Sequence, residues 1–181
     1  MSNFEEGFLE FTFSERWNVL KIDEHYDYRA GIEIVDNTKA VDFLGIFDHN
    51  ELYFIEVKDF RGHRIENRDR LLKGELPIEI AQKVRDSLAC IIGAYHRSNT
   101  PETWEPYAAL LCNKHKRINV IFWLEESLPP LHPTLREKAL ASTRTKIFKQ
   151  KLAWLTQYVL VCGNYKQIGL PEVTVKSLSR S

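Results

Sequence analysis

Cysteine is scarce in this sequence, and no long apolar run is present. The 181 residues include three cysteines, far apart and odd in number, without the paired spacing of a structural zinc site. They are Cys90, Cys112 and Cys162, each among apolar neighbours, so we expect core positions and a reducing compartment. No apolar stretch is long enough to span a bilayer, and the N-terminus lacks a basic region followed by an apolar run. We therefore expect a cytoplasmic protein with no signal peptide and no membrane partner.

Repeats, low-complexity tracts and linkers rich in proline or glycine are also absent, so the sequence justifies no domain boundary. Its length suits one domain with a real core and is too short for two comfortable ones. Hydrophobic residues make up 44% and charged residues 28%, a balance that excludes a disordered or fibrous chain. We predict a single domain over residues 1–181.

Net charge is zero at pH 7, which argues against a protein that binds nucleic acid tightly and without specificity. The charge is nevertheless divided along the chain. Residues 1–60 contain 14 acidic and 5 basic side chains, whereas residues 61–181 contain 11 acidic and 20 basic ones. An acidic part suited to a divalent cation would then join a basic part suited to phosphates. Two oppositely charged faces that attract each other explain the same division equally well.

Hydrophobic periodicity predicts an α/β protein with the order helix, three strands, helix, strand, helix, two strands. The strongest helix pattern begins near Pro77, which suits a first turn, and continues at helical spacing to Tyr95. The acidic stretch 24–38 is ambiguous, and part of it fits a further strand at 28–35. In chain order, the expected elements are a short helix at 4–14, strands at 17–23, 39–47 and 51–60, a long helix at 76–96, a short helix or its tail at 107–112, a strand at 118–124, a second long helix near 134–153, and strands at 158–163 and 173–178.

The clearest pattern is a β-hairpin built from residues 39–47 and 51–60. Between the two runs lie Asp48, His49 and Asn50, three turn formers in a loop length that hairpins often use. Both runs are apolar on both faces, which is typical of strands in the middle of a covered sheet. We therefore predict a central mixed β-sheet flanked by helices on both faces.

Three charged residues of this hairpin share one patch. Centring the loop on His49 places Asp42 opposite Glu56, and Lys58, two residues further, projects from the same face. Two carboxylates this close repel each other unless a cation or proton lies between them, and burying them unpaired costs about 2–7 kcal/mol or more. Mg²⁺, or Mn²⁺ in its place, bound by Asp42, Glu56 and the carbonyl of Val57 meets that need. Lys58 would orient or help deprotonate the attacking water, or stabilise charge on a phosphate.

The pattern of Asp42, thirteen intervening residues and then Glu56-Val57-Lys58 on the second arm of a hairpin resembles the PD-(D/E)XK nuclease superfamily. The resemblance implies a restriction-endonuclease-like α/β fold and a divalent-metal nuclease mechanism, with Asp42, Glu56 and Lys58 as catalytic residues. The proline of the motif's name is absent, because Val41 precedes Asp42. The competing interpretation is an acid–lysine pair that bridges strands on a solvated sheet face.

Many members of that superfamily carry a polar helix behind the motif strand. Here, the long helix predicted at 76–96 has a polar face made of four residues, Glu79, Gln82, Lys83 and Asp86. Among them we expect Gln82 to touch the site, as a further catalytic residue.

Other charged residues are weaker candidates. Glu10 and Glu15 would each add a metal-binding carboxylate, and Asp23 would lean toward the site, although all three also fit solvated surface charges. The segment 61–75 and the basic helix near 134–153 offer cationic surfaces for phosphates. A solvated helix face explains the basic helix equally well.

Two functions follow from these residues. The first is a Mg²⁺-dependent, endonuclease-type hydrolase of phosphodiester bonds, with DNA as the expected substrate. The second keeps the nuclease-like fold without catalysis, as a nucleic-acid-binding or protein-interaction module, which the zero net charge favours. The expected partner is nucleic acid, and the expected assembly is a homodimer or a subunit of a larger complex.

Overall fold

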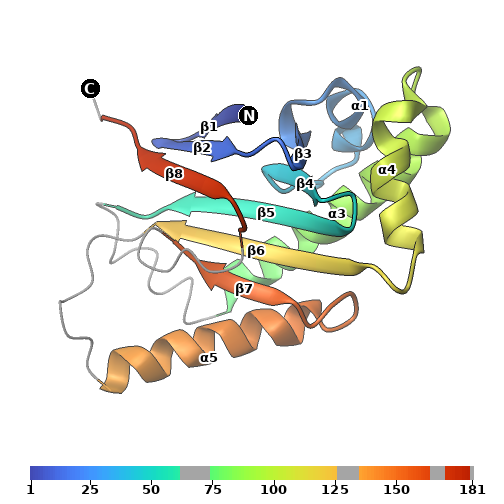
Figure 1. Ribbon diagram of the computed structural model, residues 1–181. Coiled ribbons are helices and arrows are strands. Elements are labelled where there is room, and N and C mark those ends of the chain that lie inside the picture. Colours follow the sequence, from blue (N-terminus) through green and yellow to red (C-terminus); the bar gives the residue numbers. More distant parts are fainter. Residues whose placement is uncertain (62–73, 126–134, 164–169, 180–181) are drawn as a thin grey trace.

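Two β-sheets form the framework of the molecule, one with five strands and one with three (Figure 1). The computed structural model describes residues 1–61, 74–125, 135–163 and 170–179, with the backbone alone at 135–141 and 144. The larger sheet has the strand order β3-β4-β5-β6-β7 and the smaller sheet the order β1-β2-β8. A mixed α/β fold is thereby confirmed, but with two sheets in place of the single sheet that we expected.

The larger sheet is mixed, because β3, β4 and β5 pair antiparallel whereas β5, β6 and β7 pair parallel. Its strands are β3 (Trp17–Lys21), β4 (Phe43–Phe47), β5 (Glu51–Asp59), β6 (Arg117–Glu125) and β7 (Val159–Cys162). The smaller sheet is antiparallel and contains β1 (Ser2–Glu6), β2 (Leu9–Phe13) and β8 (Val173–Ser177).

Helices lie in both connections between parallel strands. They are α3 (Glu75–Arg97), α4 (Pro101–Cys112) and α5 (Leu135–Leu152). The short α1 (Tyr26–Arg29), with 3₁₀ turns η1 (Ile22–Glu24) and η2 (Ile32–Ile34) beside it, lies between the antiparallel strands β3 and β4. Because parallel neighbours need a long connection, α3 and α4 come between β5 and β6, and α5 between β6 and β7. Among the described residues, no helix has the length and apolar character needed to cross a bilayer.

The larger sheet is covered by helices on one face and by the smaller sheet on the other. On the helix side, Leu52 and Phe54 of β5 lie in a buried cluster with residues of α3, α4 and α5. On the opposite side, Tyr53 and Ile55 lie in a second buried cluster with β2. The central strands are therefore apolar on both faces, as predicted. Over the part of the chain that the structure describes, the second face is covered by the smaller sheet and not by the helical layer that we expected there.

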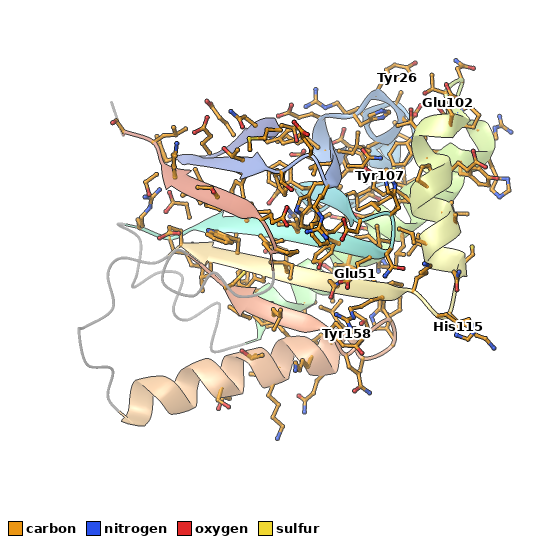
Figure 2. The ribbon with its side chains drawn as sticks, in the orientation of Figure 1. Tyr26, Glu51, Glu102, Tyr107, His115 and Tyr158 are labelled. Atoms are coloured by element: carbon orange, nitrogen blue, oxygen red, sulfur yellow. The ribbon has the colours of Figure 1, made fainter. Side chains whose placement is uncertain are left out.

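α4 lies on the helix side and has a sharply divided surface. Its Tyr107 is buried, whereas Glu102 of the same helix is exposed (Figure 2). The helix predicted at 107–112 begins earlier, at Pro101, a residue favoured in a first turn. Pro106 lies inside α4, and an interior proline ordinarily ends a helix, so the pattern predicted only the second half.

The helix predicted over residues 4–14 is wrong, because this segment forms the hairpin of β1 and β2. Its apolar residues also fit an alternating pattern. Leu9, Phe11 and Phe13 are fully buried, and the residues between them are partly exposed. Gly7 lies in the turn with a left-handed φ of 57°. A period of two therefore governs this segment, in place of the helical period.

Two smaller predictions are also corrected. The acidic stretch 24–38 contains α1 and η2, so the further strand considered at 28–35 is wrong. The strand expected at 173–178 exists as β8, but it pairs with β2 of the smaller sheet. The C-terminal part of the chain thereby completes a sheet that begins at the N-terminus.

The predicted central hairpin is confirmed together with its register. β4 and β5 pair with Phe43 opposite Ile55, around the loop 48–50. The first two residues of that loop have left-handed φ angles of 52° and 55°, as turn formers often do. Continued one residue beyond β4, this register places Asp42 opposite Glu56.

Candidate active site

β5 carries two charged residues on the face that the helices cover. Glu56 and Lys58 alternate with Val57, which faces the smaller sheet. Glu56 is fully buried, whereas the side chain of Lys58, nearer the end of the strand, is 25% exposed. The Nζ of Lys58 lies 2.8 Å from Oε1 of Glu56. The pair thus joins a buried carboxylate to a cation that solvent reaches.

Asp42 immediately precedes β4, and the backbone of β5 fixes its carboxylate. Its Oδ2 accepts a 2.6 Å hydrogen bond from the Val57 N–H, and the residue is 6% exposed. The bond directs the side chain of Asp42 toward β5, beside Glu56. The predicted proximity of Asp42 and Glu56 is therefore seen in the structure, while their catalytic roles stay predictions. The Val57 carbonyl, predicted as a metal ligand, lies in the same strand, β5, and its role as a ligand also stays a prediction.

Two side chains of α3 hold the segment that leads into Asp42. Asp86 Oδ2 accepts a 3.2 Å hydrogen bond from the Lys39 N–H. Ser87 Oγ accepts a 3.0 Å hydrogen bond from the Val41 N–H. Both α3 residues are buried, and so is Val41, so the second bond satisfies a backbone donor that has lost contact with water. Asp86, predicted on the polar face of this helix, therefore has a structural role.

A third residue of α3, Lys83, enters the site itself. Its Nζ lies 2.7 Å from Oε1 and 2.8 Å from Oε2 of Glu56. The same atom lies 3.7 Å from Oδ1 of Asp42. Lys83 is only 9% exposed, so its charge is neutralised by these carboxylates more than by water. The sequence predicts a cation between Asp42 and Glu56, and the structure has the ammonium of Lys83 within ion-pair distance of both.

Gln82, the helix residue that we expected at the site, is exposed on α3. The next residue along the helix, Lys83, makes the contact instead. The signal for Lys83 was its spacing, because it lies three residues after Ile80 and four before Ser87, both fully buried. A lysine in the buried stripe of a helix predicts a buried acidic partner.

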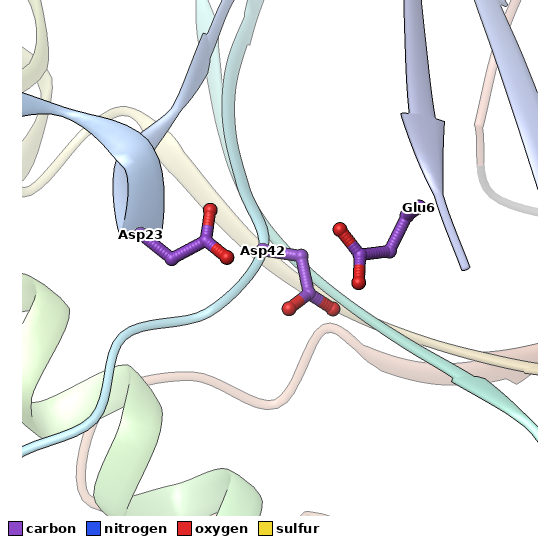
Figure 3. A group of neighbouring side chains, drawn as sticks. All are labelled: Glu6, Asp23 and Asp42. Carbon is purple, nitrogen blue, oxygen red and sulfur yellow. The ribbon is translucent and has the colours of Figure 1, made fainter.

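On its other side, Asp42 belongs to a group of three carboxylates (Figure 3). Glu6 at the end of β1 and Asp23 in η1 point toward Asp42, and one oxygen of each lies within 4.8 Å of the others. Asp23 Oδ1 is buried and has no hydrogen-bond partner among the described residues. Asp23 was a weak candidate from the sequence. Glu6 was missed, because its segment was assigned to a helix.

One of these carboxylates already has a cation beside it. Lys21 Nζ lies 3.0 Å from Glu6 Oε2 and 2.7 Å from Glu24 Oε1. It also donates a 2.8 Å hydrogen bond to the Glu5 carbonyl. Lys21 therefore divides its charge between Glu6 and Glu24, and Asp23 is the member of the group with an unsatisfied oxygen among the described residues.

The crowding of acids changes the protonation of Asp42. Burial, and then the neighbouring charge of Glu56, raise the pKa of Asp42 to about 7. Lys83 and the Val57 N–H act in the opposite direction without cancelling this effect. At neutral pH the Asp42 carboxyl is thus divided between its protonated and ionised forms, unless a further cation binds beside it.

Asp23 and Lys83 respond to the same crowding. Burial, followed by the charge of Glu6, raises the pKa of Asp23 above its usual value. Burial alone would lower the pKa of Lys83, but the charges of Glu56 and Asp42 outweigh it and raise that pKa. Lys83 is therefore charged throughout the physiological range, and the acids around Asp42 favour additional positive charge.

The other two weaker acidic candidates, Glu10 and Glu15, are not members of this group. Glu10 of β2 is paired with Glu5 across the first hairpin. The side chain of Glu15 is 89% exposed, and its Oε1 lies 3.7 Å from the N-terminal amino group. Both fit the solvated surface charges that were the competing interpretation.

The two basic surfaces expected to contact phosphates are only partly visible. Most of the segment 61–75 lies outside the described residues. In α5, Lys146, Lys149 and Lys151 are exposed. A cationic helix surface is thus present, and its role in binding stays a prediction.

Comparisons with known proteins give this site no relative. A scan of protein-family models, a search of curated proteins and a search of solved structures each find no match to the chain. The chemistry must therefore be inferred from the residues themselves, in particular from Asp42, Glu56, Lys58 and Lys83.

Proposed function

We propose that this chain is a metal-dependent phosphodiester hydrolase of the PD-(D/E)XK type, with DNA as its substrate. The observation that supports this most is the meeting of Asp42, Glu56 and Lys58 at the covered face of one hairpin. An isolated acid–lysine pair on a solvated sheet would be exposed, whereas Asp42 and Glu56 are 6% and 0% exposed. Buried charges of this kind often mark functional sites.

The carboxylates around Asp42 fit a hard divalent cation. Mg²⁺ and Mn²⁺ prefer carboxylate oxygens, and Asp42, Glu6 and Asp23 offer three of them within 4.8 Å. The buried, unsatisfied Oδ1 of Asp23 is an acceptor that such an ion would satisfy. When bound, the ion would supply Lewis acidity and a water of lowered pKa. Glu56, predicted as a ligand beside Asp42, has both oxygens in contact with Lys83.

Lys58 is the residue best placed to meet a substrate phosphate. Its ammonium contacts the buried Glu56, which fixes its position, while a quarter of the side chain faces solvent. Glu79 Oε1 lies 3.8 Å from the same Nζ and further restricts it. A fixed ammonium at the surface stabilises charge that develops on phosphate oxygens during hydrolysis.

Cleavage assays with purified protein test this function. After treatment with EDTA, the protein is supplied with Mg²⁺ or Mn²⁺ and incubated with duplex DNA, single-stranded DNA and RNA. We expect metal-dependent cleavage of DNA that Asp42→Asn and Lys58→Met each reduce by about 100-fold or more. Glu102→Gln and Lys114→Met, exposed changes of the same chemical types, are the matched controls. Absence of cleavage of every substrate with both metals would refute the activity.

A second function is supported by Lys83. Because its ammonium contacts both oxygens of Glu56, the buried pair is neutralised without any added ion. This favours a nuclease-like fold that binds nucleic acid or protein without catalysis. Titration calorimetry separates the two functions, because Mn²⁺ binding together with cleavage supports the hydrolase. An absence of both supports the non-catalytic module.

A further inference from the structure

The ammonium of Lys83 lies beside Glu56 and near Asp42, where the proposed function expects a metal ion. Oε1 of Glu56 lies 2.7 Å from Lys83 Nζ and 2.8 Å from Lys58 Nζ, and Oε2 lies 2.8 Å from Lys83 Nζ. Both oxygens of this fully buried carboxylate are therefore in contact with protein cations. A divalent ion that bound Glu56 would lie beside one or both of these ammonium groups and be repelled by them.

Lys83 also has little room to leave. It lies on the buried stripe of α3 between Ile80 and Ser87, both fully buried, and is itself 9% exposed. An ammonium ion needs water or acidic partners, and Ile80 and Val84, which flank Lys83 on the buried stripe of α3, belong to the apolar helix-side core. Lys83 and Glu56 thus form a fixed pair, and Asp42 is the acid that remains under-compensated.

We propose that Lys83 is a built-in substitute for a metal ion at Glu56, so that a divalent ion binds through Asp42 and not through Glu56. The inference rests on the proposed function, since it assigns the ligands of the same site. Glu56 then becomes a positioning residue, which holds Lys58 at the surface and Lys83 in the interior. Removal of the Lys83 ammonium opens a site in which Asp42 and Glu56 bind the ion together.

Calorimetric titration with Mn²⁺ measures this directly, without any substrate. We expect Asp42→Asn to weaken Mn²⁺ binding by about tenfold or more and Glu56→Gln to change it by less than about threefold. Lys83→Met and Lys83→Gln should strengthen binding by about tenfold or more, because each frees a carboxylate oxygen for the ion. Lys83→Arg, which keeps the charge, should bind Mn²⁺ as the unaltered protein does.

Two results would overturn the inference. One is a loss of Mn²⁺ binding in Glu56→Gln as large as the loss in Asp42→Asn. The other is unchanged affinity in both Lys83→Met and Lys83→Gln. Thermal unfolding of each variant shows whether it is folded. If both neutral Lys83 variants fail to fold, the Glu56→Gln comparison still decides.

The outcomes also separate this inference from the proposed function. Should the unaltered protein neither bind Mn²⁺ nor cut DNA while Lys83→Met gains binding, the hydrolase and the ion at Asp42 both fail, and only the substitution of Lys83 for an ion at Glu56 stands. Should the unaltered protein bind and cut, but lose both in Glu56→Gln, the hydrolase stands and the role of Lys83 fails. An absence of binding in every variant refutes both.

Discussion

At the scale of single residues, Asp42 has two different surroundings. On one side it accepts a hydrogen bond from Val57 and lies 3.7 Å from the Lys83 ammonium. On the other side it faces Glu6 and Asp23, whose charges add to its own. The pKa of Asp42 is nevertheless raised mainly by burial and by the charge of Glu56, and Glu6 adds a smaller contribution. The raised pKa makes the protonation of Asp42 measurable through the stability of the metal-free protein.

We expect the metal-free protein to lose stability as pH rises, and Asp42→Asn to remove part of that loss. The pKa of Asp42 is raised to about 7 from an ordinary value of 3.8, so the folded state holds this proton more tightly than the unfolded state. Between those two values the free energy of unfolding should fall by about 1.4 kcal/mol per pH unit, and above pH 7 this contribution should no longer change.

Urea denaturation in EDTA at several pH values between 5 and 8 measures this effect. The difference between the unaltered protein and Asp42→Asn isolates Asp42 from other titrating groups. Glu102→Gln, an exposed acid, should keep the pH dependence of the unaltered protein. Parallel pH profiles for the unaltered protein and Asp42→Asn would show that the pKa of Asp42 is not raised.

At the scale of elements, the hairpin of β4 and β5 and the helix α3 were predictable because their patterns are local. A loop of three turn formers fixed the register, and the register alone placed Asp42 beside Glu56. The first hairpin was not predictable in this way. Phe4, Phe8 and Leu9 also fit a helical stripe, and the strand that decides between the two, β8, comes more than 150 residues later.

The same limit explains which site residues were found. Glu56 and Lys58 lie on one strand, so their common face follows from the alternation of side chains. Glu6 comes from a strand that the sequence assigned to a helix. The choice between Gln82 and Lys83 depends on the rotation of α3 about its axis, which its packing against the sheet determines.

Strand β4 contains a glycine whose place in the fold is steric. A methyl group at Gly45 would lie 2.8 Å from Cζ3 of Trp17, whose ring packs across β4 from β3. We expect Gly45→Ala to destabilise the protein by about 1–3 kcal/mol, because the rigid indole must move. Gly93 in α3 has open space around it, so Gly93→Ala should stabilise by about 0.5–1 kcal/mol. Urea denaturation of both variants checks the opposite signs, and equal effects would contradict the close approach of Trp17.

At the scale of the whole molecule, the site lies where three layers meet. The smaller sheet supplies Glu6, the central hairpin supplies Asp42 and Glu56, and the helical layer supplies Lys83. The helices and the smaller sheet pack on opposite faces of the larger sheet (Figure 1). Loosening the smaller sheet, which carries Glu6, should therefore weaken Mn²⁺ binding more than loosening the helical layer, even when the two changes cost the same stability.

Phe11 and Phe148 offer a matched pair for this comparison. Phe11 of β2 is fully buried, with its ring 5.5 Å from Phe43 and 5.4 Å from Trp123. Phe148 of α5 is also fully buried, with its ring 5.0 Å from Phe122 on the helix side. Replacement of either phenylalanine by leucine should destabilise the protein by a similar amount, about 1–2 kcal/mol.

Their effects on Mn²⁺ binding should nevertheless differ. Phe11→Leu loosens the sheet that carries Glu6, so we expect weaker Mn²⁺ binding, by about three- to tenfold. Phe148→Leu leaves the β1–β2 hairpin in place and should bind Mn²⁺ as the unaltered protein does. Calorimetry at a temperature where both variants remain folded, as thermal unfolding establishes, makes the comparison. Equal affinities in the two variants would mean that the smaller sheet contributes no ligand, and that Glu6 lies beside Asp42 only as a neighbouring charge.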